Sequence, residues 1–315
     1  MKDRLLTSLG LGIVFILIFV LKQYVSAYFF DAFIALIMVV ASYEFSKILT
    51  KMGKFNHSEM IMMFPIVLAV GLVVSLFLGA GYYSLLIGLG FVACFTLGVF
   101  LVDLIFAKQT KKEMAIREFD GPLVKFAFKK ALNTMYGYLY PAFVLSCMIL
   151  LNHFEVLSSV GEQFADVSFF VLLFAFLIPI FTDSFAMLIG SLIEGKKLCP
   201  KISPSKTISG AIGGALSCVV LCATLFLLFN QIESISLLLN SVNLGINSIW
   251  KLVLIVFFGS IVSQFGDIFE SYLKRRAKVK DSGRILPGHG GILDRFDSYI
   301  FVAPYILLAF LFLFI

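Results

Sequence analysis

The chain has 315 residues, of which 60% are hydrophobic and only 14% are charged, and it carries a net charge of +6. A water-soluble domain has about a quarter charged residues, so this composition excludes a soluble protein of this size, as well as a disordered or coiled-coil chain. At about 20 residues for each membrane-spanning helix, the apolar content predicts an all-α integral membrane protein with many spans.

Long uncharged apolar stretches predict about nine transmembrane helices within a single polytopic membrane domain over residues 1–315. In chain order they lie at about 5–21, 24–45, 61–80, 82–106, 131–151, 167–193, 208–229, 249–269 and 298–315. A shorter apolar stretch near 234–246 predicts an interfacial or re-entrant segment. The first stretch follows Lys2 and Arg4, which also suits a cleaved signal peptide. The run is long for a signal, and we expect a retained span.

The basic residues are confined almost entirely to one side of this arrangement, which holds 23 of the 25 Lys and Arg residues. That side receives the N-terminus and the loops near 46–60, 107–130, 194–207 and 270–297. Only Lys22 and Lys251 fall on the other side. The positive-inside rule therefore predicts a cytoplasmic N-terminus and an outside C-terminus. Since membrane topology accounts for the positive charge, no nucleic-acid partner is expected.

Acidic side chains collect near the cytoplasmic ends of the last spans. Asp267 lies at the inner end of the eighth span, and Asp294 and Asp297 lie just before the ninth. Their i, i+3 spacing places them on one helix face if the helix begins that early. Lys206 immediately precedes the seventh span, and Asp183 lies inside the sixth. Ionisable groups at membrane depth mark function, and clustered carboxylates repel one another unless a hard cation binds them. Oxygen-only ligation favours Mg²⁺.

These acids have a second interpretation, as a solvated interfacial network neutralised by neighbouring basic residues. The candidates for that role are Lys274, Arg275 and Arg295. Spacing alone leaves both interpretations open. Three other acids at membrane depth are Asp31, Glu44 and Asp103. They are expected to stand apart from the cluster, in helix-end or bundle-polar roles.

Two segments on the cytoplasmic side suit phosphate binding. Residues 271–297 contain a basic run followed by Pro287-Gly288-His289-Gly290-Gly291; glycines let backbone N–H groups approach an anion, and Lys and Arg add charge. Residues 203–207 place hydroxyls and a lysine at a helix N-terminus, where the dipole favours phosphate. Both segments indicate a polyphosphate with Mg²⁺. Contact of the basic run with anionic lipid is the alternative.

Residues 271–297, called the signature segment below, resemble the signature of the phosphatidate cytidylyltransferase (CDP-diacylglycerol synthase) family. Its pattern is S-x-apolar-K-R, four residues, K-D-x-G, then P-x-H-G-G-apolar-x-D-R-apolar-D. The residues in register are Ser271, Lys274, Arg275, Lys280, Asp281, Gly283, Pro287, His289, Gly290, Gly291, Asp294, Arg295 and Asp297. Upstream, residues 266–271 resemble the family's G-D-x-x-E-S run, and residues 202–207 resemble its I-S-P-x-K-T segment.

Two positions depart from the family pattern. The family usually has N-D-T-G-A where residues 182–186 read Thr-Asp-Ser-Phe-Ala, so Asp183 is kept and Phe185 replaces a glycine. After K-T the family commonly has an acidic residue before glycine, whereas here Ser209 precedes Gly210. The N-terminal half of the chain shows only a general multi-span character.

The resemblance implies the reaction CTP + phosphatidate → CDP-diacylglycerol + pyrophosphate, dependent on Mg²⁺ and with room for a second cation. It implies a catalytic part at about 167–315, in which Asp267, Asp294 and Asp297 hold the metal. Lys206 and His289 are further catalytic candidates, and His289 has a structural role in the glycine turn as its alternative. The implied substrate-binding residues are Ser203, Lys206, Thr207, Lys274, Arg275, Lys280, Gly290, Gly291, Arg295 and Asp183.

The expected partners are CTP, phosphatidate and membrane lipids, in a bacterial-type cytoplasmic (inner) membrane; a homodimer is left open. Two other functional classes are also open. One is another CTP-dependent lipid enzyme, such as a polyprenol kinase or a CDP-archaeol-type synthase. The other is a transporter, which acids at membrane depth would suit, although an inverted repeat would then be expected and none stands out.

Overall fold

The computed structural model describes residues 2–81, 83–116, 118–157, 165–241, 245–286 and 290–314. The chain divides into two compact units, each built from two segments. Unit 1 consists of Met1–Ser146 and Arg276–Asp294, and unit 2 consists of Cys147–Arg275 and Arg295–Ile315. The signature segment therefore contributes residues to both units.

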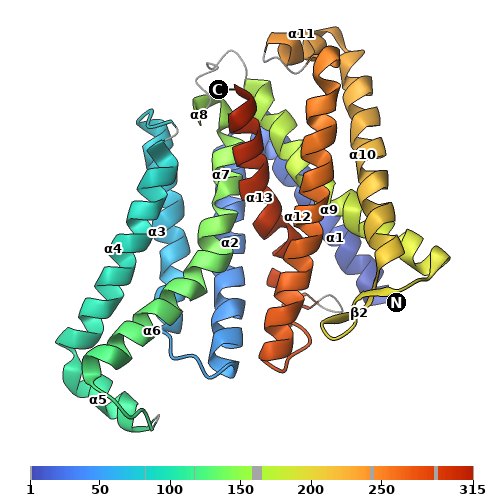
Figure 1. Cartoon of the computed structure of the whole chain (residues 1–315). Coiled ribbons are helices and arrows are strands. Elements are labelled where there is room, and N and C mark those ends of the chain that lie inside the picture. The colour runs from blue at the N-terminus through green and yellow to red at the C-terminus, as the bar shows by residue number, and fades with distance from the viewer. Residues whose placement is uncertain are drawn as a thin grey trace. The chain divides into compact units, whose positions relative to one another are not determined.

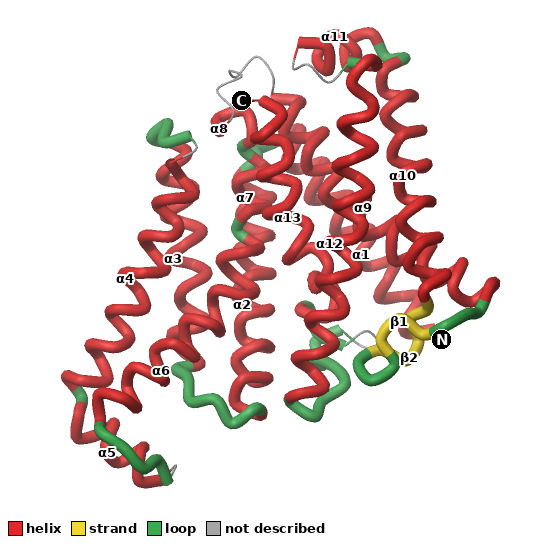
Figure 2. The backbone as a smooth tube through the Cα atoms, in the orientation of Figure 1, coloured by secondary structure: helices red, strands yellow, loops and turns green. Residues whose placement is uncertain are grey.

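Helices form nearly all of the regular structure in each unit (Figures 1 and 2). Unit 1 contains α1 (Lys2–Tyr24), α2 (Tyr28–Lys51), α3 (Ser58–Phe77), α4 (Tyr83–Ile105), α5 (Ala107–Ile116), α6 (Leu123–Tyr138) and a π-helical turn (Leu139–Phe143). Unit 2 contains α7 (Cys147–Asn152), α8 (Phe154–Leu157), α9 (Ala165–Ile193), β1 (Lys197–Cys199), β2 (Ser203–Thr207), α10 (Ile208–Asn230), α11 (Glu233–Ser241), a 3₁₀ turn (Ile246–Ser248) and α12 (Ile249–Arg276). The last helix, α13 (Leu293–Phe314), begins in unit 1 and continues in unit 2.

Within the described ranges, eight helical segments are long and apolar enough to cross a membrane. They are Tyr28–Lys51, Ser58–Phe77, Tyr83–Ile105, Leu123–Asn152, Val167–Ile193, Ile208–Asn230, Ile249–Arg276 and Leu293–Phe312. Helix α1 adds a shorter apolar stretch, Gly12–Tyr24. Each predicted span overlaps one of these helices, which confirms an all-α multi-pass membrane protein. The count of nine spans and the side of each terminus stay predictions.

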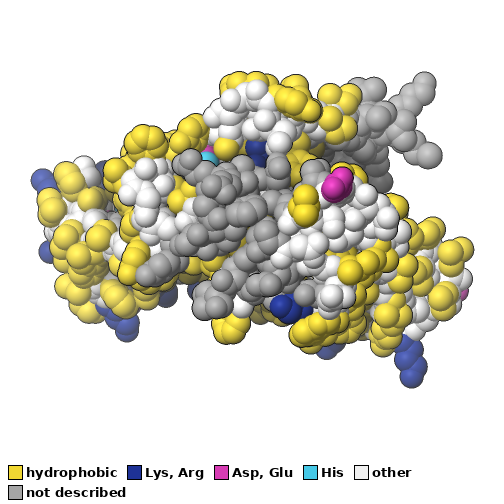
Figure 3. All heavy atoms as spheres, turned by 90° about the horizontal axis from the view of Figure 1, so that it is seen from above, with side chains coloured by type: hydrophobic (Ala, Val, Ile, Leu, Met, Phe, Trp, Pro, Cys, Tyr) yellow, Lys and Arg dark blue, Asp and Glu magenta, His cyan; other side chains and the backbone are white. Residues whose placement is uncertain are grey.

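Large hydrophobic side chains are exposed along these helices. Examples from both units are Phe77, Leu78, Met187, Leu192 and Phe312. In the view of Figure 3, hydrophobic side chains cover much of the described surface that is visible, and charged side chains are few. Exposed apolar surface of this extent indicates contact with lipid chains.

In unit 2, α9 and α10 cross closely because small residues lie at the contact. A Cβ built on Gly214 would lie 2.7 Å from the backbone oxygen of Thr182, and one on Gly210 would lie 2.5 Å from that of Ala186. Small residues let two membrane helices approach backbone to backbone. This crossing brings the first turn of α10 beside the part of α9 that carries Asp183.

A second close crossing in unit 2 joins α12 to α13. A Cβ on Gly266 would lie 2.7 Å from the backbone oxygen of Asp297 and 3.1 Å from the Cα of Ser298. Because Gly266 immediately precedes Asp267, the crossing brings the carboxylate-bearing turns of the two helices together.

A small antiparallel hairpin connects α9 to α10. Strands β1 and β2 pair Lys197 with Thr207 and Cys199 with Ser203. The sequence pattern indicates no strand here, because runs of three and five residues are too short for a periodic signal. Thr207 ends the hairpin and is the N-cap of α10, where its Oγ1 accepts a hydrogen bond from Gly210 N at 3.1 Å.

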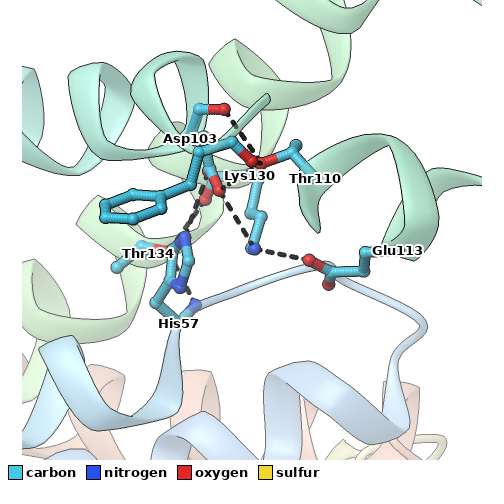
Figure 4. A network of polar contacts seen from close by, with 7 residues as sticks. His57, Asp103, Thr110, Glu113, Lys130 and Thr134 are labelled. Carbon is cyan, nitrogen blue, oxygen red and sulfur yellow. Dashed lines mark hydrogen bonds and ion pairs between the residues drawn. The ribbon is translucent and has the colours of Figure 1, made fainter. Parts of the chain in front are cut away.

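A polar network in unit 1 links α4, α5, α6 and the loop before α3 (Figure 4). Asp103 lies 3.1 Å from His57 Nε2 and 3.3 Å from Lys130 Nζ, which also lies 2.6 Å from Glu113. Thr134 Oγ1 accepts from the backbone N–H of His57. The Asp103 and Lys130 side chains are about 95% buried, so their charges stabilise each other inside the bundle. Asp103 thus has the bundle-polar role that its position indicates.

Candidate functional site

The central contact of the unit 2 site is an ion pair between a hairpin and a helix. Lys206 on β2 places its Nζ 2.6 Å from Asp267 Oδ2 on α12. Both side chains are about a quarter exposed, so solvent and ligands can reach them. Ser271, one turn after Asp267, donates a weak hydrogen bond to Asp267 Oδ1 at 3.4 Å.

Three carboxylates from three helices of unit 2 share this site. Asp183 on α9 and Asp297 on α13 each lie close enough to be repelled by Asp267, and they also repel each other. Ser298 donates its hydroxyl to Asp183 Oδ2 at 3.3 Å, and its backbone N–H to Asp297 Oδ1 at 2.6 Å. Lys206 is attracted to Asp183 as well. The site thus concentrates negative charge around one lysine.

A pocket of about 850 Å³ opens beside these groups in unit 2. Its polar lining includes Asp183, Lys197, Lys206 and Asp267, and the start of α10 also borders it. The volume lies within the range of ligand-binding pockets. With lysines, carboxylates and a helix N-terminus in its lining, the pocket can bind a phosphorylated ligand together with a cation.

The next turns of α12 carry two basic residues of the signature segment. Lys274 is buried and ion-paired with Glu270, four residues earlier, and it also attracts Asp297. Arg275 is exposed and donates its Nε–H to the backbone oxygen of Ile202, just before β2. Lys274 therefore neutralises part of the acidic cluster, and Arg275 ties the hairpin to α12.

In unit 1, Asp294 organises the loop between α12 and α13 (277–292). Its Oδ2 accepts hydrogen bonds from Ser282 N at 2.9 Å, Ser282 Oγ at 2.9 Å and Gly291 N at 2.8 Å. Gly290 has a φ of +84°, a conformation that glycine adopts readily. Its carbonyl accepts a hydrogen bond from Leu286 N. This turn holds the Asp294 carboxylate in one orientation.

The all-oxygen character of Asp183, Asp267 and Asp297 suits a hard cation such as Mg²⁺. In this conformation Lys206 contacts Asp267, and no three His, Cys, Asp or Glu side chains within the described ranges are spaced to hold a metal ion. The carboxylate oxygens are suitable ligands for a cation. In this conformation the ammonium group of Lys206 provides the positive charge beside Asp267.

Several predicted site residues have other surroundings. Thr207 caps α10 and also lines the unit 2 pocket, whereas Lys280 and Arg295 are exposed. His289 lies outside the described residues. Ser203 pairs with Cys199 in the hairpin. A ligand contact of any of these residues stays a prediction.

One acid was placed wrongly by the sequence analysis. Glu44 does not stand apart: it accepts hydrogen bonds from Ser282 Oγ at 3.1 Å, Ile292 N at 3.2 Å and Leu293 N at 2.8 Å. Glu44 and Ser282 are 238 positions apart in the chain, and no local pattern joins them. The available signal was the presence of an acid near the cytoplasmic end of a predicted span.

Comparison with known proteins identifies the family to which the chain belongs. Residues 2–314 match the cytidylyltransferase family. The phosphatidate cytidylyltransferase of Staphylococcus haemolyticus is 48% identical over 133 residues, which are 42% of this chain and 46% of that protein. The protein of that name from Bacillus subtilis is 49% identical over 125 residues, which are 40% of this chain and 41% of the relative. The aligned part thus spans less than half of each relative.

Proposed function

Because the chain belongs to the cytidylyltransferase family, we propose that it transfers the cytidylyl group of CTP to phosphatidate at the cytoplasmic face of a bacterial inner membrane. The products are CDP-diacylglycerol and pyrophosphate. The observation that carries the proposal is the Lys206–Asp267 pair at the wall of a polar pocket in a membrane-embedded helical unit. Its relatives named phosphatidate cytidylyltransferase favour this lipid substrate.

In this reaction an oxygen of the lipid phosphate attacks the α-phosphorus of CTP. The bond from that phosphorus to the bridging oxygen of the β-phosphate breaks, and pyrophosphate leaves with that oxygen. The lipid phosphate is largely ionised at neutral pH, so no side chain has to remove a proton from it. The protein therefore acts mainly by positioning two anions and offsetting their charge.

Lys206 and the start of α10 are the phosphate-binding elements of this proposal. The ammonium group of Lys206 exchanges Asp267 for a phosphate oxygen, and Lys197 on the same pocket wall adds a second positive charge. The helix N-terminus contributes free N–H groups and a favourable dipole. Arg275 and Lys274 hold the hairpin and the acidic cluster in place, so that these donors point into the pocket.

Asp267 and Asp297 would hold Mg²⁺, and the family pattern adds Asp294, three residues before Asp297 in the chain, as a further predicted ligand. When bound, the cation offsets phosphate charge and makes the α-phosphorus more electrophilic. Asp183 is the fourth acid, and Ser298 orients it through the hydrogen bond to Oδ2. The repulsion among Asp183, Asp267 and Asp297 supports this assignment, because a cation relieves it.

The test is pyrophosphate release by the detergent-purified protein from CTP, with and without phosphatidate and Mg²⁺. We expect release that requires both. CTP labelled at the α-phosphate should leave its label on the lipid, together with cytidine. Label transfer from the γ-phosphate instead would identify a lipid kinase and refute the proposal, as would pyrophosphate release that is independent of phosphatidate.

A further inference from the structure

Glu44 on α2 is a buried carboxylate that accepts two backbone hydrogen bonds in unit 1 and shares the single hydroxyl proton of Ser282 with Asp294. It is 1% exposed, and it belongs to none of the ion pairs found in the described part of the chain. Its donors are Ser282 Oγ, Ile292 N and Leu293 N. A carboxylate buried so completely needs such donors to offset the loss of hydration.

These contacts complete the start of α13. The helix begins at Leu293, and the residue before it, Ile292, has no side-chain oxygen with which to cap the first N–H groups. Glu44 supplies that acceptor from another helix. Its negative charge also interacts favourably with the positive end of the helix dipole.

Glu44 also explains two glycines of the signature segment. A Cβ built on Gly283 or on Gly291 would overlap the Glu44 carboxylate. Neither glycine has a φ in the left-handed region, so backbone conformation does not demand glycine at either position. The close approach of the Glu44 carboxylate favours glycine at both positions, because any side chain there would displace the carboxylate.

The effect of Glu44 reaches Asp294 through Ser282. The Ser282 hydroxyl lies 3.1 Å from Glu44 Oε2 and 2.9 Å from Asp294 Oδ2, and the Ser282 backbone N–H also donates to Asp294. Displacing Ser282 therefore removes two of the hydrogen bonds that orient Asp294.

We propose that Glu44 is a positioning residue for cytidylyl transfer: it fixes Ser282 and Ile292 in the loop between α12 and α13, together with the first turn of α13, and thereby the orientation of Asp294. The loop-fixing role is independent of the proposed function, whereas the effect on turnover rests on it. The residue lies in the N-terminal half of the chain, outside the signature segment.

Glu44→Gln is the sharpest single change. Gln keeps the length and shape of the side chain but replaces one acceptor oxygen with an amide donor. In either orientation of the amide, that donor would face the backbone N–H of Ile292 or of Leu293, neither of which can accept, so at least one contact is lost. Ser46→Ala is the matched control, because Ser46 is buried on the same helix and its Oγ donates only locally, to Tyr43 O.

Limited trypsin digestion of the detergent-purified protein measures the loop directly. Lys280 and Arg284 are exposed cleavage sites within the loop, and Lys111 and Lys112 on α5 are exposed internal references. In Glu44→Gln we expect the rate of cleavage at the loop sites to rise about tenfold or more. The reason is that loss of a hydrogen bond to a charged group makes local opening of the loop more frequent. Cleavage at the reference sites should match that of the wild type, as should all sites in Ser46→Ala.

Kinetics separate positioning from binding. In Glu44→Gln we expect kcat to fall by about 10- to 100-fold, with KM for CTP nearly unchanged, because Lys206 and its pocket belong to the other unit. Glu44→Asp, which keeps the charge but shortens the reach, should recover part of that loss. Ser46→Ala should retain wild-type kinetics.

A double-mutant cycle tests the contact with Gly283. Gly283→Ala alone should accelerate loop cleavage, because the new methyl group displaces the carboxylate. In a Glu44→Ala background the clash is gone, so Gly283→Ala should add no further acceleration. Independent effects that multiply would show that Glu44 does not impose glycine at this position.

The outcomes distinguish this inference from the proposed function. Wild-type loop cleavage in Glu44→Gln, or acceleration at the loop and reference sites alike, would overturn the positioning role. If the wild-type protein transfers no cytidylyl group, the proposed function fails, yet the digestion still decides whether Glu44 holds the loop. Accelerated loop cleavage with unchanged kcat would refute the link from the loop to turnover.

Discussion

Lys206 Nζ lies 2.6 Å from Asp267 Oδ2, so a lysine at the end of a short hairpin neutralises a carboxylate on the long helix α12. The pair borders the unit 2 pocket. It places a mobile positive charge and a candidate cation ligand side by side, which is the combination that a reaction between two phosphates requires.

Replacing Lys206 with Ala should mainly weaken phosphate binding. We expect the apparent KM for CTP to rise by about tenfold, the loss of one hydrogen bond to a charged group, while the protein remains folded. Steady-state kinetics over a range of CTP concentrations measure the change, and Lys201→Ala, an exposed lysine in the hairpin turn, is the control. Unchanged affinities for CTP and for phosphatidate would remove Lys206 from the site.

Replacing Asp294 with Asn should abolish transfer without disturbing the loop. Asn retains an oxygen that can accept from Ser282 and Gly291, but it lacks the charge that a cation needs. We expect kcat to fall by about 100-fold or more, with loop cleavage by trypsin close to that of the wild type. Near-normal activity of the purified variant would end the assignment of Asp294 as a cation ligand. Asp120→Asn, at an exposed position, controls for the substitution itself.

The close crossing of α9 and α10 predicts a steric penalty at Gly214. A methyl group there would meet the backbone oxygen of Thr182, and overpacking of this kind costs about 1–3 kcal/mol. Thermal unfolding in detergent should show Gly214→Ala to be destabilised. Gly98→Ala, where no atom lies within 4 Å of the added Cβ, should be neutral. Equal stability of the two variants would contradict the packing described for this crossing.

The buried Lys130–Asp103 pair predicts a larger effect on stability in unit 1. Lys130→Met leaves Asp103 and Glu113 without their lysine, and breaking a buried pair costs about 3–5 kcal/mol. The double variant Lys130→Met/Asp103→Asn should be more stable than Lys130→Met alone, because it removes the buried Asp103 charge, which would be left with His57 as its remaining ionisable partner. The measurement is again thermal unfolding, and a double variant that is less stable than either single one would refute this account.

Membrane class and approximate span positions followed from composition and hydropathy. A stretch of apolar residues long enough to cross the bilayer has to be helical there, because the backbone must satisfy its own hydrogen bonds in lipid. Hydropathy placed Asp294 and Asp297 near the start of the last helix, whereas α12 continues to Arg276, well beyond the predicted span end near Asp267. The hairpin between α9 and α10 was missed, since short polar strands leave no such pattern.

The contacts between side chains from distant parts of the chain were decided by the tertiary structure. Lys206 and Asp267 are 61 positions apart in the chain, and only the packing of α9, α10 and α12 brings them together. The role of Glu44 was hidden for the same reason: hydropathy locates an acid within a helix, but it carries no information about which loop fills the space beside it. A contact between distant segments depends on how whole helices pack against one another. The reason for a glycine such as Gly214 or Gly283 is therefore visible only when the positions of the neighbouring atoms are known.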